Sequence, residues 1–171
     1  MAEPVRYRLD PTHSFVYFEV VHFNASTLRG RFGPISGEVT LDREAGSGYV
    51  GLTIPTAGVS TGSPTLDERL RDADLLSTVE FPTAYFVAER FVFDAGALRE
   101  VSGELTLRGT SVPLTLKAQR FRCYLNPLLR HQVCGGDFEA EMNRSWIGAT
   151  YGLPFVADHV RLMVSVEAVK E

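Results

Sequence analysis

Side chains that could do nucleophilic, acid–base or metal chemistry are few and widely spaced along this chain. The four histidines stand at positions 13, 22, 131 and 159, a spacing that matches no metal-ligand pattern and predicts no metal centre. His13 precedes Ser14, but neighbouring residues of a strand point to opposite faces, so the pair is expected to be the entry of a strand rather than a nucleophile and its base. The glycines at 30, 33 and 37 lie between expected strands and open no helix, which argues against a phosphate-binding loop. No catalytic motif is present.

Two groups of charged residues could hold a polar head group. The first crowds one short segment: Asp67, Arg69, Arg71, Asp72 and Asp74. This segment is either a solvated, mutually paired helical face or a polar rim that binds an anionic group through Arg69. The second group is Arg144 with Trp146 nearby, and Arg144 is either a head-group ligand or part of an internal ion pair.

The two cysteines, Cys123 and Cys134, flank a loop that contains Pro127. They could be two buried free thiols, or a disulfide that a turn brings within bridging distance. A disulfide would imply an oxidising compartment and contribute about 2–3 kcal/mol through loop closure. With His131 as the one nearby imidazole, the set is too small for a structural zinc site.

Composition indicates one globular domain, expected over residues 4–171. The chain has 171 residues, 44% of them hydrophobic, and a net charge of -4. It has no Lys/Arg cluster long enough to follow a row of phosphates, so nucleic-acid binding is not expected. No apolar run approaches the roughly 18 residues of a membrane-spanning helix. Residues 1–4 lack the features of a signal peptide, which fits a cytoplasmic protein or a secreted one whose signal has been removed.

Strand patterns dominate the chain. Strands are expected in these segments: Val5–Leu9, Ser14–Phe23, Pro34–Leu41, Tyr49–Ser60, Ala84–Phe93, Gly103–Ala118 (a hairpin that turns near Arg108-Gly109), Glu139–Asn143 and His159–Val169. Ser14–Phe23 is apolar on both faces, which predicts burial on both sides. Residues 63–76 predict one helix, with Ser63 as N-cap, that closes one mouth of a barrel. The expected fold is all-β: an extended eight-stranded antiparallel barrel with one short helix.

The aromatic content raises the question of what fills such a barrel. Eleven Phe and six Tyr residues are a large aromatic surface for this chain. A barrel of eight strands either fills its interior with side chains or holds one ligand there. Small residues on the strands, Gly51, Gly58, Ala84 and Ala88, would leave room for a ligand. Periodicity alone does not separate these alternatives.

Several motifs, in order and with their spacing, resemble those of the YceI-like family. They are Asp10-Pro11-Thr12-His13-Ser14 with Phe18 and His22, Gly30-Arg31-Phe32, Ser60-Thr61-Gly62, Asp67-Glu68-Arg69-Leu70, Asp74-Leu75-Leu76, Phe81-Pro82-Thr83, Val101–Gly109, Asn143-Arg144-Ser145 and Val160–Val169. Each motif is weak alone, but together they span nearly the whole chain. The resemblance implies a lipocalin-like barrel that binds polyisoprenoid chains, quinone-like molecules or fatty-acid amides. It also implies a periplasmic or secreted, often dimeric protein that is not a catalyst, and it favours the disulfide between Cys123 and Cys134.

Two positions depart from the family pattern. The family helix usually carries Asp-x-His-Leu, whereas Arg69 occupies the histidine position here, which would favour a more anionic head group. The aromatic residue after Arg144 stands one place early, as Trp146.

These observations lead to a primary hypothesis and two alternatives. The primary hypothesis is a non-catalytic carrier of an isoprenoid lipid or quinone, with no catalytic cofactor, periplasmic or secreted and possibly a homodimer. Its expected ligand-binding residues are Phe15, Phe18, Val20, His22, Val50, Leu52, Arg69, Leu70, Phe86, Leu107, Leu116, Arg144, Trp146 and Met163. One alternative is an enzyme acting on the same lipid, with His13 or His22 as base and Asp67 as its partner. The other is a partner-binding or stress-response module.

Overall fold

Ten strands, one α-helix and three short 3₁₀ segments make up the computed structural model, which describes residues 3–171. The expectation about the N-terminal segment lies partly outside this range, since Met1 and Ala2 are not described. The strands are β1 (Val5–Leu9), β2 (Phe15–His22), β3 (Ser26–Phe32), β4 (Ser36–Asp42), β5 (Ser47–Pro55), β6 (Thr83–Asp94), β7 (Ala97–Leu107), β8 (Thr110–Asn126), β9 (His131–Asn143) and β10 (His159–Lys170). The helix is α1 (Pro64–Leu70), and the 3₁₀ segments are Pro11–His13, Thr56–Gly58 and Arg144–Ile147.

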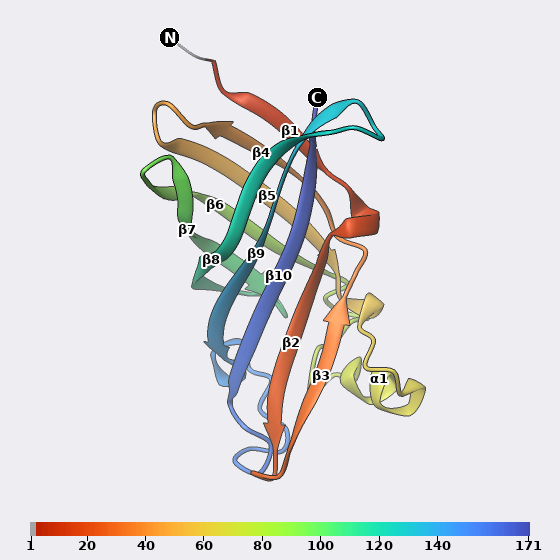
Figure 1. Cartoon of the computed structure of the whole chain (residues 1–171). Coiled ribbons are helices and arrows are strands. Elements are labelled where there is room, and N and C mark those ends of the chain that lie inside the picture. The colour runs from red at the N-terminus through yellow and green to blue at the C-terminus, as the bar shows by residue number, and fades with distance from the viewer. Residues whose placement is uncertain (1–2) are drawn as a thin grey trace.

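Eight of these strands close into an antiparallel barrel. Neighbours follow the order β1-β4-β5-β6-β7-β8-β9-β10, and β10 pairs again with β1 to complete the circle. β10 pairs with β1 near its end, at Ala168–Lys170, and with β2 nearer its start, at Arg161–Ser165. β1 and β2 therefore pair with successive stretches of β10. The β2–β3 hairpin extends the wall at the lower end in Figure 1. The all-β barrel expected from the strand pattern is confirmed.

Strand periodicity accounts for most of the wall. On β10, Val160, Leu162 and Val164 are buried and face the interior, whereas Arg161 and Met163 between them are only partly buried. The β7–β8 turn at Arg108-Gly109 has positive φ at both residues, the backbone that a two-residue hairpin turn requires. These local patterns were enough to predict β10 and the turn.

The structure differs from the sequence-based expectation at several elements. The expected hairpin Gly103–Ala118 is longer at both ends, because β7 begins at Ala97 and β8 continues to Asn126. β3 was not predicted, because its two arginines and Gly30 obscure the alternation of the strand. Gly30 is needed there, since an added Cβ would lie 2.4 Å from Cζ of Phe18. β9 begins at His131 and not at Glu139, because pairing with both β8 and β10 overrides the low strand propensity of its two glycines.

Two further differences concern α1 and β2. The helix is confirmed with Ser63 as its N-cap, but it ends at Leu70. In Figure 1 it stands to the right of β3, toward the lower part of the molecule. The burial of β2 on both faces was wrong: Val16, Phe18 and Val20 are buried, whereas Val21 is largely exposed. The outer face of β2 is therefore covered only in part.

Candidate functional site

An apolar chamber of about 70 Å³ lies inside the upper half of the barrel. All eight closing strands contribute to its wall, with residues such as Leu9, Val39, Leu52, Phe86, Val101, Leu116, Phe138 and Val164. Tyr7 brings the one hydroxyl among the lining side chains, and burial raises its pKa above the usual range. The chamber therefore favours hydrocarbon over charged groups.

A second apolar chamber of about 50 Å³ continues the first toward the lower end. On β5 the upper chamber is lined by Leu52 and the lower one by Ile54, the next residue on the same face; on β6 the corresponding pair is Phe86 and Ala84. The chambers thus follow one another along the barrel axis. Both are smaller than the roughly 300–1,000 Å³ of typical small-molecule sites, so a long ligand requires lumen side chains to rotate.

Seven of the residues predicted to bind a ligand face the interior of the barrel. Val50, Leu52, Phe86 and Leu116 line the upper chamber, and Leu107 lines the lower one. The other two, Phe18 and Val20, are buried on the inward face of β2.

Two residues predicted to line the lumen lie on the outer face of the wall, so their assignment to the lumen was wrong. The Phe15 ring lies beneath the guanidinium group of Arg31, with 4.6 Å from the guanidinium carbon to the ring centroid. Met163 stands opposite Tyr17 on one side and Glu139 on the other, among outward residues. Phe15 lies on a strand that carries apolar residues on both faces. Met163 lies on the face of β10 opposite to Val160, Leu162 and Val164, so the alternation of this strand already argued against a place in the lumen.

The remaining predicted residues lie at or near the lower end of the barrel. His22 ends β2 and is exposed, Trp146 is half exposed, and Leu70 packs against the core. Arg69 forms ion pairs with Asp72 and Asp74. Its hydrogen bonds to Asp74 are the largest of the effects that raise its pKa. This is the self-paired helical face that was one of the two alternatives.

Arg144 is a structural residue of the lower loop. Its Nε donates to the carbonyl of Ala157 at 2.8 Å, and Nη2 donates to that of Val156 at 2.8 Å. Nη1 donates to the carbonyls of Ala149 and Tyr151, each at 2.7 Å. The side chain is buried, which lowers its pKa. Four of the five guanidinium donors are thus engaged by backbone, and this arrangement replaces both the head-group role and the internal ion pair.

The two cysteines form a disulfide. Cys123 on β8 and Cys134 on β9 stand directly opposite each other, with their Cα atoms 4.0 Å apart. Cys134 also lines the upper chamber. The bond therefore ties the β8–β9 hairpin together where the hairpin borders the lumen.

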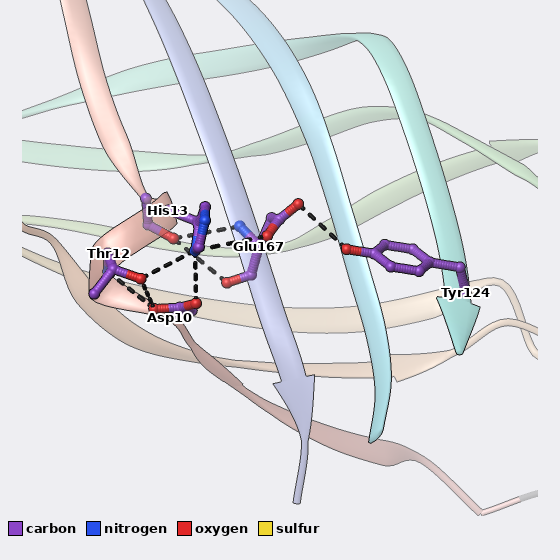
Figure 2. Close-up of polar contacts among 6 residues, drawn as sticks. Asp10, Thr12, His13, Tyr124 and Glu167 are labelled. Carbon is purple, nitrogen blue, oxygen red and sulfur yellow. Dashed lines mark hydrogen bonds and ion pairs between the residues drawn. The ribbon is translucent and has the colours of Figure 1, made fainter. Parts of the chain in front are cut away.

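A polar cluster outside the lumen was not predicted from the sequence. Figure 2 shows His13 of the first 3₁₀ segment between Asp10 and Glu167 of β10. The distance from His13 Nδ1 is 2.8 Å to Asp10 Oδ2 and 3.9 Å to Glu167 Oε2, and Tyr124 donates a hydrogen bond to Glu167. One possible metal-ligand atom from each of Asp10, His13 and Glu167 lies within 4.8 Å of the other two, a spacing that could admit a cation. Sequence reasoning missed the cluster because Glu167 is distant along the chain.

The base and acid expected for the enzyme alternative are not brought together. Asp67 accepts hydrogen bonds from the amide and hydroxyl of Thr61, each at 2.7 Å. His13 is paired with Asp10 on the outer wall, and His22 lies against Phe23.

Replacing His13 with Asn is expected to remove a pH-dependent contribution to stability. The hydrogen bond to Asp10 raises the pKa of His13, and the charges of Asp10 and Glu167 add to this effect. A raised pKa stabilises the fold fully below the unfolded value of about 6.5, and the effect is lost as pH rises through the folded pKa. Melting temperatures of wild type and variant should therefore differ most near about pH 5.5 and converge above about pH 8.

The control for this prediction is the same substitution at His131, on the β8–β9 hairpin. A difference between wild type and the His13→Asn variant that stays constant from acid to alkaline pH would contradict the prediction, because it would reflect a loss of packing and not of charge.

A closed antiparallel barrel with an apolar lumen is the architecture of lipocalin-like proteins. Residues 7–168 match the YceI-like domain, and the chain is 30% identical over 168 residues to protein YceI of Escherichia coli O157:H7, covering 96% of this chain and 87% of that protein. The chain belongs to the YceI-like family. No helix in residues 3–171 has the length and apolar character needed to span a membrane.

Solved structures share this fold at low sequence identity. Burkholderia cenocepacia BcnA superimposes with a TM-score of 0.73 at 21% identity, covering 93% of this chain and 98% of that one. A polyisoprenoid binding domain from Saccharophagus degradans gives a TM-score of 0.68 at 19% identity, covering 98% of this chain and 99% of that one.

Proposed function

We propose that this protein is a non-catalytic carrier that holds a long isoprenoid-type lipid, a polyprenyl chain or an isoprenoid quinone, in the barrel lumen. The observation that carries the proposal is the pair of apolar chambers that follow one another inside the barrel. Burial of apolar ligand surface supplies roughly 25 cal/mol per Å², and this contribution requires no charged partner in the lumen. The shared fold of the polyisoprenoid binding domain from Saccharophagus degradans supports the same ligand class.

The proposal assigns the lipid chain to the lumen and does not depend on a head-group site at the lower end. Arg144 donates to four backbone carbonyls, and Arg69 is paired with two aspartates. The disulfide favours an oxidising compartment. We therefore place the carrier in the periplasm or outside the cell.

Native mass spectrometry of the protein purified from a bacterial host tests this function. We expect a ligand-bound mass, and extraction should release a molecule with the mass spacing of isoprene units. An unliganded mass, together with failure to bind a fluorescent polyene, would overturn the proposal. Conversion of an added prenyl lipid to a product of different mass would instead support the enzyme alternative.

A further inference from the structure

The β8–β9 hairpin extends beyond the part of the wall in which β8 is paired on both sides. Pairing between β7 and β8 ends at Glu100 and Lys117, whereas β8 continues to Asn126 and pairs there with β9. A register shift between Ala118 and Arg120 marks the point of departure, and such irregularities bend a strand. In Figure 1 the hairpin tip, in cyan, projects beside the C-terminus at the upper end of the barrel.

The tip of this hairpin displays leucines on a fixed turn. Leu125 is 71% exposed, Leu128 91% and Leu129 51%. The side-chain oxygen of Asn126 accepts hydrogen bonds from the amides of Leu128 and Leu129, at 2.9 and 3.2 Å. The disulfide below the turn holds the two strands together. Because the turn is already ordered, these leucines lose little conformational entropy when they enter an apolar phase.

The charge of the hairpin differs in sign from that of the whole chain. Residues 119–136 contain three arginines, at 120, 122 and 130, together with His131. All 21 Asp and Glu residues of the chain lie outside this segment, and the net charge of the chain is -4. Exposed leucines flanked by arginines form a surface that is complementary to the head groups and upper acyl region of an anionic bilayer.

The same hairpin borders the upper chamber. Phe121 of β8 and Cys134 and Gly136 of β9 line it, and Leu98 contributes from β7. β7 and β8 make no ladder pairs beyond Glu100 and Lys117 among the described residues. The hairpin therefore adjoins a stretch of wall in which no ladder joins β7 and β8.

We propose that the hairpin tip, residues 122–130, docks on the surface of an anionic phospholipid bilayer, with Leu128 and Leu129 in the interface and Arg122 and Arg130 on the head groups. The inference rests on the proposed function for its purpose, since the bilayer is where an isoprenoid lipid enters or leaves the lumen. The docking itself depends only on the tip.

Co-sedimentation with vesicles tests the proposal. Wild type should bind vesicles of phosphatidylcholine with phosphatidylglycerol, bind phosphatidylcholine alone more weakly, and lose affinity as salt is raised. The Leu128→Asp, Leu129→Asp double variant should bind at least about tenfold more weakly. Each of Arg122→Gln and Arg130→Gln should cost roughly fivefold. Val79→Asp is the matched control, because Val79 is 97% exposed beyond α1, away from the hairpin.

Two further measurements separate the competing outcomes. Binding of a fluorescent polyene should be unchanged in the leucine variant, so a failure of lipid carriage appears in the polyene assay and a failure of docking appears in the vesicle assay. Light scattering follows the oligomeric state of each variant. The docking proposal is overturned if wild type does not bind anionic vesicles, if Val79→Asp weakens binding as much as the leucine variant does, or if the leucines prove to hold a dimer that binds no vesicles.

Discussion

Replacing Arg144 with leucine is expected to lower the free energy of unfolding by roughly 2–4 kcal/mol, because four backbone carbonyls, most of them partly buried, lose their donor and a buried acceptor left unpaired costs about 1–3 kcal/mol. The carbonyls belong to Ala149, Tyr151, Val156 and Ala157, so one guanidinium group joins four points of the loop between β9 and β10. Urea unfolding of the two proteins at one pH measures the difference.

The shape of the guanidinium group is part of this prediction. Lysine at position 144 keeps the charge but presents three donors from one atom, so Arg144→Lys should recover only part of the lost stability. Arg29→Leu is the control, since Arg29 is exposed and makes one long ion pair, at 3.6 Å with Glu19, that is worth about 1 kcal/mol or less. If the free energy of unfolding of Arg144→Leu lies within about 1 kcal/mol of wild type, the prediction is wrong, because water then replaces the guanidinium group at little cost.

Filling the lumen is expected to weaken lipid binding while the barrel persists. Ala168 lines the upper chamber and Ala84 the lower one. Phenylalanine at either position should weaken binding of a long fluorescent polyene by more than about tenfold, because the added ring occupies the path of the chain and removes apolar contact area. Overpacking should also lower the stability by about 1–3 kcal/mol.

Chain length distinguishes the two positions. Ala84→Phe closes only the lower chamber, so it should impair long prenyl chains more than short ones, whereas Ala168→Phe should impair both. Val87→Phe is the control, because Val87 lies on the same strand as Ala84 but points outward and is 45% exposed. Fluorescence titration with ligands of increasing length provides the measurement. Equal affinities in all three variants and the wild type would place the ligand outside the lumen.

Sequence patterns were sufficient where local chemistry decides the structure. The alternation along β10 predicted which residues face the interior, because successive side chains of a strand point to opposite sides. The N-cap at Ser63 with Pro64 predicted the start of α1, and Arg108-Gly109 predicted a hairpin turn. Each of these signals is contained within a few neighbouring residues.

Tertiary structure decided every feature that joins distant parts of the chain. Phe15 and Phe18 are equivalent as apolar strand residues, and only the pairing of β2 with β10 and β3 places one outside and the other inside. The sequence left Arg144 as a candidate ligand of a lipid head group. In the structure its guanidinium group donates to backbone carbonyls of its own loop. His13 and Glu167 meet because β10 closes the barrel against the first strands. The sequence by itself thus determined the antiparallel barrel and its apolar content, because period and turn chemistry are local. Which side chains line the lumen depends on register and closure, and these are properties of the whole sheet.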